Sequence, residues 1–367
     1  SWKAHVARGS RMKAYLNRVA TAVPPNDVHA RFVRFAGDLL GEGRTRPVFD
    51  RLVARSGIES RWSVLSLSPD VPPDSVGVEA VDAEQLYRRG AFPSTGERMR
   101  IYERFAIGLA VRAVEGLGEL GRVTHVIAVS CTGLSAPGLD LQLVGRLGLD
   151  PGVERTVIGF MGCYAGINAL KAARHIVRSE PSARVLIVSV ELCTLHLQET
   201  DDLEQVLSFL VFGDGCAAAL VSADPVGLGL DRFHAELMPE AASQITWAVG
   251  DQGFDMVLSG QVPASVGAAL RQGQARILDG GQVGDIALWA VHPGGRSVLD
   301  AVQGALGLAP AALAHSREVL RGNGNMSSAT VLFVLERMMR EAEGGERGVA
   351  MAFGPGLTAE TMLFTAA

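Results

Sequence analysis

Short runs of β-branched residues alternate with longer helical patterns along the chain, and this alternation limits the fold more than any other feature. The pattern predicts buried strands at 123–130, 156–160, 185–190, 216–221, 286–291 and 349–353. It predicts helices at 97–117, 164–177, 297–306 and 327–343. In the second of these helices, apolar residues recur at Ile167, Leu170, Ala173 and Val177. Such alternation is typical of an α/β protein whose internal sheets are covered by helices.

The 367 residues are enough for one large domain or two ordinary ones. A seam near 223–229 suggests halves at 12–225 and 226–367, each with several strand–helix units. No linker rich in Pro or Ser separates them, so we expect one packed body. Residues 1–11 are basic and small, which suggests a tag or a flexible arm. The polar stretch 198–205 is expected to be a solvated loop or a helix start.

Charge and cysteine spacing exclude several classes of function. The net charge of −5 leaves no basic surface typical of nucleic-acid binding. The longest apolar runs have strand length and are far too short to span a bilayer. The four cysteines form no CxxC pair, which argues against a zinc ribbon or a dithiol redox site. Without a secretory segment near the start, a cytoplasmic protein with unpaired cysteines and no metal is expected.

Cys163 is the strongest candidate for a reactive group. The predicted strand before it ends at Phe160, and the predicted helix begins at about Cys163. The positive end of a helix dipole favours a thiolate over a thiol. Gly162 and Gly166 would let a substrate approach closely. A buried structural cysteine explains this local pattern equally well.

Two further segments could supply partners for a thiolate. His292 follows a predicted strand and precedes Pro and two Gly, which places it on a loop at a strand end. Asn325 lies in a turn before a helix that Ser327 or Ser328 could cap. A histidine bonded to nearby backbone and a plain helix entrance are the alternatives. Together, however, Cys, His and Asn can hold a thiolate and polarise a thioester carbonyl.

Five ordered segments resemble the type III polyketide synthases, the chalcone synthase-like branch of the thiolase superfamily. They are GFMGCYAG at 159–166, VFGDGCAAALV at 211–221, WAVHPGG at 289–295, GNMSSA at 324–329 and AFGPGLTAE at 352–360. The resemblance covers nearly the whole chain from Met12. It implies a thiolase fold, with two αβαβα halves in a five-layered body, and a homodimer.

The resemblance also implies a mechanism. Cys163 would be the nucleophile, with His292 and Asn325 as its partners. An acyl-CoA starter would load onto the sulfur, and decarboxylation of malonyl-CoA would then extend it by Claisen condensation until the chain cyclises. No cofactor is bound in this mechanism, because coenzyme A thioesters are the substrates. A carrier protein or a fatty acid synthase could also deliver the starter.

Other positions match family residues that surround the substrate. Phe212 and Met256 match the gatekeepers, and Met256 departs from the usual Phe, which makes the gate more adaptable. Arg51 and Arg55 match positions that contact coenzyme A phosphates, whereas the third such position is Val48. Gly354, Pro355 and Gly356 match the loop that shapes the cyclisation pocket. The family positions that line the cavity wall are Cys131, Ala136, His196 and Trp247.

The product expected from the resemblance is an alkylpyrone or an alkylresorcinol built on a long fatty acyl starter. The bulky Trp247 should narrow one arm of the cavity and disfavour the chain fold needed for an aldol ring, so a pyrone is favoured. A malonyl-only tetrahydroxynaphthalene synthase and a ketoacyl-carrier-protein synthase of the initiation type are alternatives. A non-catalytic thiolase-like binding protein and a papain-like thiol hydrolase agree less well with the motifs.

Overall fold

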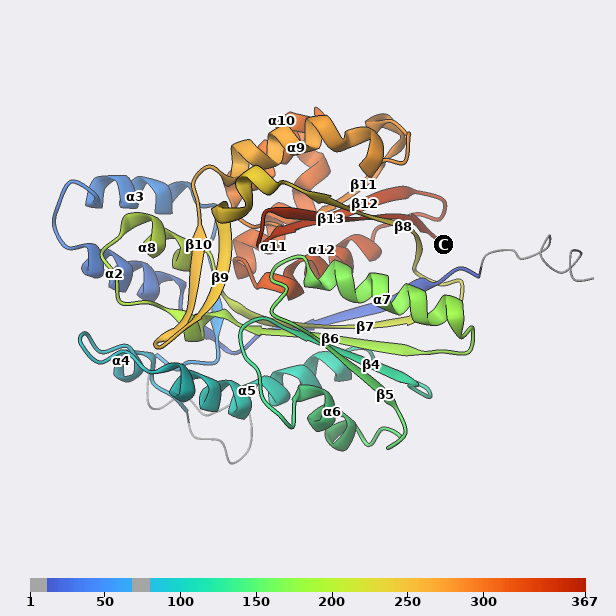
Figure 1. The fold of residues 1–367 in the computed structure, drawn as a ribbon, viewed down its shortest axis with the longest axis horizontal. Helices are drawn as coiled ribbons and strands as arrows, with labels where there is room; N and C mark the ends of the chain where they lie inside the picture. The colour runs from blue at the N-terminus through green and yellow to red at the C-terminus, as the bar shows by residue number, and fades with distance from the viewer. Residues whose placement is uncertain (1–11, 68–79) are drawn as a thin grey trace, which may run out of the picture.

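The computed structural model describes residues 12–67 and 80–367, and residues 1–11 lie outside this part. Nine strands form one mixed sheet in the order β11-β12-β13-β8-β1-β7-β6-β4-β5. The central strands β1 and β8 pair at only two positions, Tyr15 with Gly229 and Leu16 with Leu228. The sheet therefore separates beyond this junction into two layers, which Figure 1 shows with helices between them.

The first layer comes from the first part of the chain. Strand β4 pairs in parallel with β5 and β6, whereas β7 runs antiparallel to both β6 and β1. Its strands are β1 (Tyr15–Ala22), β4 (His125–Ser130), β5 (Glu154–Gly159), β6 (Val185–Leu192) and β7 (Asp214–Ser222).

The second layer repeats this pattern with one strand fewer. Strand β11 pairs in parallel with β12, and β13 runs antiparallel to both β12 and β8. Its strands are β8 (Leu228–Leu237), β11 (Leu288–Val291), β12 (Arg347–Gly354) and β13 (Thr358–Ala366).

Helices cover both sheet layers and fill the space between them. The middle layer contains α7 (Ala165–Ser179) and α12 (Thr330–Met339) (Figure 1). One outer layer contains α5 (Thr95–Glu115) and α6 (Leu139–Leu147), and the other contains α9 (Val262–Ile277) and α10 (Arg296–Leu306). The order of layers is αβαβα, which confirms the predicted five-layered body.

The middle helices approach closely because of a glycine. A Cβ atom on Gly166 in α7 would lie 2.6 Å from the carbonyl oxygen of Ser328, just before α12. The predicted apolar stripe of α7, Ile167 to Val177, is buried in the core between the sheets.

Smaller elements stand at one end of the layers (Figure 1). They are β2 (Asn26–Asp27), α2 (His29–Leu40), α3 (Arg46–Arg55), β3 (Trp62–Ser63), α4 (Ala83–Leu86), α8 (Leu203–Leu210), β9 (Ile245–Gly250) and β10 (Gly253–Leu258), with α11 (Ala314–Asn323) beside α12. The polar stretch 198–205 does lead into a helix, because Asp202 caps α8.

Two sequence predictions about the elements were partly wrong. The run 156–160, predicted to be buried, overlaps β5. Five of the six residues of β5 are exposed, because β5 is an edge strand that among the described strands pairs only with β4. The helix expected at 327–343 starts with a 3₁₀ turn, Ser327–Ala329, and ends at Met339. All four cysteines are free, as expected. Within the described ranges, no helix combines the length and apolar character needed to cross a membrane.

Candidate active site

Cys163 lies in a tight loop between β5 and α7, buried at the inner end of α7. In the loop just before Cys163, Phe160 and Gly162 have positive φ angles of 61° and 84°. A Cβ atom on Gly162 would lie only 2.4 Å from Cδ of Pro355. Glycine at this position therefore allows the Cys163 loop to pack directly against the loop that follows β12.

Asn325 reaches the sulfur of Cys163 from the other half of the chain. Its side-chain Oδ1 and Nδ2 both lie 4.0 Å from Cys163 Sγ. The backbone N–H of Ser327 donates to Oδ1 at 2.8 Å, which fixes the orientation of the amide. Its Nδ2 is then available as a donor, and it contacts the carbonyl of Gly294 at 3.3 Å.

His292 lies on the loop after β11, and its ring is near Gly294, which accepts from Asn325: a Cβ atom on Gly294 would lie 3.7 Å from the ring. The backbone N–H of His292 donates to the carbonyl of Met351, and its side chain is almost fully buried. Neither ring nitrogen has a hydrogen-bond partner within the part of the chain that the structure describes. Leaving a buried polar group unpaired costs about 1–3 kcal/mol, so such a group in a folded protein calls for an explanation. A group that bonds to a substrate explains it.

The protonation states differ from the sequence prediction. Burial raises the pKa of the Cys163 thiol to about 11, although hydrogen bonds from Ser327 and Asn325 counteract part of this effect. Burial also lowers the pKa of His292 to about 3. Burial therefore opposes both a protonated imidazole and the thiolate that the helix end was expected to favour.

A narrow apolar cavity surrounds the sulfur of Cys163. It has about 20 Å³ of open space, roughly enough for one water molecule. Its walls are formed by Cys131, Thr132, Gly162, Cys163, Cys193, Phe209, Phe212, Trp247, Met256, Ser327 and Pro355. An acyl chain can enter only if part of this wall moves.

Two of the four expected cavity-wall residues line this space. Trp247 does so, and its indole N–H donates to the carbonyl of Cys131 at 2.6 Å. Cys131 also lines it, and its sulfur lies 3.0 Å from the Ser327 hydroxyl. His196 is buried behind Trp247, where its ring crosses the indole at 81°. Ala136 is exposed on a loop and does not line the cavity.

His196 supports the wall and does not contact the substrate space. Its Nε2 bonds to the carbonyl of Thr132, its Nδ1 accepts from the N–H of Phe254, and its ring stacks on Phe254 with a centroid distance of 4.2 Å. Burial lowers the pKa of His196 to about 3, so it remains neutral. These contacts fix the His196 ring, which packs edge-on against Trp247.

Both expected gatekeepers line the cavity, and one is held by a buried arginine that the sequence did not reveal. Arg61 donates from Nη1 to the carbonyls of Phe209 and Phe212 at 3.0 and 2.8 Å. No equivalent contact involves the Met256 side chain, which is flexible by nature. Within the described residues, Met256 is therefore the wall residue best suited to move.

The expected cyclisation loop, Gly354 to Gly356, lies against Cys163. The hydroxyl of Tyr164 donates to the carbonyl of Pro355 at 3.3 Å. A Cβ atom on Gly354 would lie 2.6 Å from the Tyr164 ring and 3.4 Å from the backbone nitrogen of Cys163. Pro355 lines the cavity, whereas Gly354 and Gly356 shape the backbone around it.

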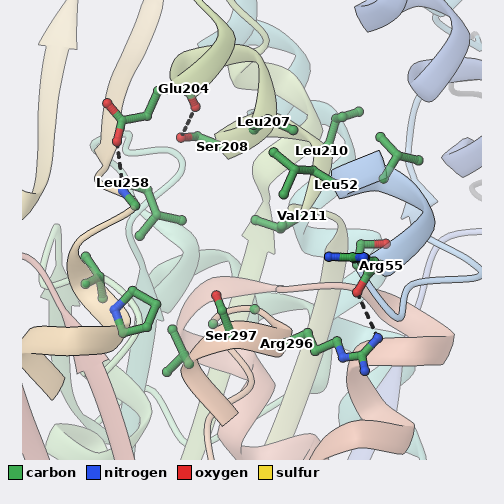
Figure 2. Close-up of a pocket in the computed structure, with 18 of the residues that line it drawn as sticks. Leu52, Arg55, Glu204, Leu207, Ser208, Leu210, Val211, Leu258, Arg296 and Ser297 are labelled. Carbon is green, nitrogen blue, oxygen red and sulfur yellow. Dashed lines mark hydrogen bonds between the residues drawn. The ribbon is translucent and has the colours of Figure 1, made fainter. Parts of the chain in front are cut away.

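A wider cavity of about 1040 Å³ opens at the surface, with residues of α2, α3, α8 and α10 in its lining (Figure 2). Its lining includes Arg55, as expected for a carrier site, and the loop residues Gly294 and Gly295 that follow His292. Arg51 is not part of this lining. It is exposed, and its Nε donates to the carbonyl of Pro47 at 3.3 Å. Arg296, which the sequence analysis did not select, lines the cavity instead.

One group of side chains in the described part of the chain could hold a metal ion, and it lies away from Cys163. It consists of His125, Glu154 and Glu180, with ligand atoms within 4.8 Å of one another. His125 and Glu154 begin β4 and β5, whereas Cys131 and Cys163 follow the carboxyl ends of these strands. This group therefore has no part in chemistry at Cys163.

The family follows from comparison with known proteins. Residues 5–225 match the N-terminal domain of chalcone and stilbene synthases, and residues 230–367 match their C-terminal domain. The chain belongs to this family. It is thus a type III polyketide synthase, an acyltransferase with a thiolase fold, as the sequence motifs indicated.

Individual relatives agree with this family assignment. The alpha-pyrone synthesis polyketide synthase-like Pks18 of Mycobacterium tuberculosis is 37% identical over 79% of this chain and 78% of its own length. Bisdemethoxycurcumin synthase of Oryza sativa is 36% identical over 95% of this chain and 91% of its own. The crystal structure of 1,3,6,8-tetrahydroxynaphthalene synthase from Streptomyces coelicolor has a TM-score of 0.84 and 29% identity, covering 96% of this chain and 99% of that one.

Proposed function

We propose that this polyketide synthase loads a long-chain fatty acyl-CoA on Cys163, extends it with malonyl-CoA and releases an alkylpyrone or alkylresorcinol. The observation that carries the assignment of the site is the buried imidazole of His292, unpartnered among the described residues, on the loop whose Gly294 accepts from the oriented amide of Asn325. Two such donors can bind the oxygen of a thioester, and the sulfur of Cys163 lies beside the amide.

Burial disfavours the charged forms of both Cys163 and His292, and the first step follows from this. When a starter thioester binds, the thiol proton of Cys163 passes to His292 as sulfur attacks the carbonyl carbon. The tetrahedral intermediate expels the coenzyme A thiolate, which takes up that proton, and the acyl-enzyme remains. Proton transfer coupled to attack avoids a separated charge pair in a site that disfavours both ions.

Extension uses the same donors. Malonyl-CoA loses carbon dioxide, and the negative charge that develops on its thioester oxygen is stabilised by N–H groups of His292 and Asn325. The resulting carbanion attacks the acyl-enzyme, forms a carbon–carbon bond and frees the sulfur of Cys163. Loss of one such donor lowers rates by about 100- to 1000-fold. We therefore expect Asn325→Ala to lose extension and to retain more of the loading step.

A pyrone is favoured because Trp247 forms a fixed wall. The bond of its indole to the Cys131 carbonyl and its contact with His196 oppose rotation into another orientation. A relative whose name describes alpha-pyrone synthesis, 37% identical, supports this product class. Space for a long starter must come from movement of the wall, and Met256 is the residue that we expect to move.

The second candidate is a synthase that joins only malonyl units into tetrahydroxynaphthalene. Its support is the similarity to the Streptomyces coelicolor tetrahydroxynaphthalene synthase and the small closed cavity, which suits short intermediates. A ketoacyl-carrier-protein synthase is less favoured, because both chalcone and stilbene synthase domains match.

We also propose a homodimer formed through the exposed edge of β5. Val157 on β5, Met161 after it and Leu134 on the neighbouring loop expose large apolar side chains, and such a patch on an edge strand suits contact with a second copy of the chain. A cytoplasmic location, a carrier protein as an optional acyl donor, and halves at 12–225 and 226–367 belong to the same proposal. Sedimentation of the purified protein tests the dimer.

The deciding experiment offers malonyl-CoA alone and with acyl-CoA starters from short to long, and identifies the products by mass. Pyrones formed only with long starters support the main proposal. A naphthalenetetrol from malonyl-CoA alone supports the second candidate. A requirement for carrier-bound malonate would contradict both. In parallel, a thiol-reactive acyl probe should label the wild type and fail to label Cys163→Ser, while Cys193→Ser serves as the control.

A further inference from the structure

The wide surface cavity has two arginines on one side (Figure 2). Arg55 ends α3 and Arg296 begins α10, and Nη1 of Arg296 donates to the backbone carbonyl of Arg55 at 3.2 Å. The Arg296 side chain also passes Gly57, where an added Cβ atom would lie 3.9 Å from its Cδ. These contacts hold the Arg296 guanidinium at the cavity although its side chain is about half exposed.

Acidic groups in the same lining are largely engaged elsewhere. Asp202 caps α8 by accepting from the N–H of Gln205, and Glu204 accepts from the N–H of Gly260 at 2.7 Å. Asp300 lies 3.7 Å from Nε of Arg296 but only 2.7 Å from Nη2 of Arg317, outside the cavity. Asp300 is therefore shared and neutralises Arg296 only in part.

We propose that Arg296 acts with Arg55 as the anion-binding pair for the phosphate groups of the coenzyme A carrier. This proposal rests on the proposed function, because it concerns the thioester substrates of the same site. A guanidinium offers five N–H donors in a planar fork that matches phosphate oxygens. The contacts of Arg296 with described residues use Nη1 and Nε, which leaves Nη2 for a ligand.

The position of Arg296 in the chain links phosphate binding to the reactive group. It follows His292 by four residues, and the intervening Gly294 accepts from the Asn325 amide. Gly294, Gly295 and Arg296 all line the cavity. A carrier with its phosphates on Arg296 therefore extends along the loop that ends at His292. Of the other two positions matched to coenzyme A phosphates, Arg51 does not line the cavity and Val48 carries no charge. Arg296 therefore supplies a cation that these two positions do not.

A purely structural role for Arg296, as a tie between α3 and α10, predicts a different result, and substitutions separate the two. Arg296→Gln keeps a donor for the Arg55 carbonyl and removes the charge, whereas Arg296→Lys keeps the charge. Arg232→Gln is the matched control, since Arg232 also pairs with an aspartate, Asp279, but neither residue lines the cavity.

The experiment measures binding of coenzyme A and of phosphate-free pantetheine by calorimetry, with no catalytic turnover needed. Arg296→Gln should weaken coenzyme A binding by about 3- to 10-fold and leave pantetheine binding unchanged. Arg296→Lys should recover part of the loss, and Arg232→Gln should bind like the wild type. The difference between wild type and Arg296→Gln should shrink as salt increases.

Three results would overturn the role of Arg296: unchanged coenzyme A binding in Arg296→Gln, an equal loss for pantetheine, or the same loss in Arg232→Gln. Turnover is measured separately with a long-chain acyl-CoA starter and malonyl-CoA. A wild type that binds coenzyme A but makes no polyketide would contradict the proposed function and leave the phosphate site standing. Normal turnover with unaltered binding in Arg296→Gln would refute only the phosphate site.

Discussion

The contact between Gly162 and Pro355 allows a sharp test of how the Cys163 loop is positioned. In Gly162→Ala, the new methyl group would lie 2.4 Å from Cδ and 2.8 Å from Cγ of Pro355. A proline ring cannot rotate away from such a contact as a flexible side chain can. One of the two loops must therefore move, and both of them line the cavity around the sulfur.

The cost has two separable parts. Alanine at a φ of 84° pays about 1–2 kcal/mol for the left-handed conformation. Overpacking against Pro355 adds about 1–3 kcal/mol. The sum predicts that the free energy of unfolding falls by about 2–5 kcal/mol. Displacement of the sulfur by a fraction of an ångström to 1 Å should lower kcat by about 10- to 100-fold.

Gly345→Ala isolates the first part, because Gly345 has a φ of 89° and no atom within 4 Å of an added Cβ. Urea unfolding, and turnover with a long-chain acyl-CoA starter and malonyl-CoA, are measured for both variants and the wild type. We expect Gly345→Ala to lose about 1–2 kcal/mol with normal turnover. Equal destabilisation of the two variants, or full activity of Gly162→Ala, would show that the Pro355 contact does not hold Cys163 in place.

Three other substitutions test the site, each by a different measurement. Trp247→Gly should raise the resorcinol-to-pyrone ratio seen by mass spectrometry, whereas Trp247→Phe should leave it near that of the wild type; an unchanged ratio in Trp247→Gly would contradict the role of this wall. His292 becomes protonated below about pH 6.5 in the unfolded chain but only near pH 3 in the folded protein. Between these values the unfolded chain binds the additional proton, so His292 lowers the free energy of unfolding as the pH falls. His292→Gln should therefore flatten the acid side of the stability profile by about 1.4 kcal/mol per pH unit relative to the wild type, measured by urea unfolding from pH 7 to 5. Ser327→Ala removes a hydrogen bond that lowers the pKa of Cys163, so alkylation of the thiol should require a higher pH; an unshifted alkylation profile would refute that.

Local patterns in the sequence predicted most of the elements because those patterns arise from neighbouring residues. The stripe from Ile167 to Val177 is buried on α7 as its spacing indicated. The exposure of β5 was not predictable in the same way, since an apolar run looks alike in a central strand and at an edge. Only the order of strands decides between these cases, and that order depends on contacts far apart in the chain.

Charge states and distant partners escaped the sequence for a related reason. The helix start before α7 suggested a thiolate at Cys163, but the degree of burial comes from the packing of both halves. Arg61 lies in a segment without a recognisable motif and Arg296 lies just outside one, and their partners are backbone carbonyls of remote residues. Family motifs located Trp247 correctly, yet they could not show that His196 supports it from behind.

The repeated strand order explains why no single motif identified the site. Cys131 follows β4 in the first layer as His292 follows β11 in the second. Cys163 precedes α7 as Asn325 precedes α12, and both helices lie in the middle layer. Each half therefore supplies a strand-end residue and a helix-entrance residue, but the sulfur comes from one half and its donors from the other. Chemistry at Cys163 depends on the close approach of these helices, so any change that separates α7 from α12 should abolish activity before it unfolds either sheet.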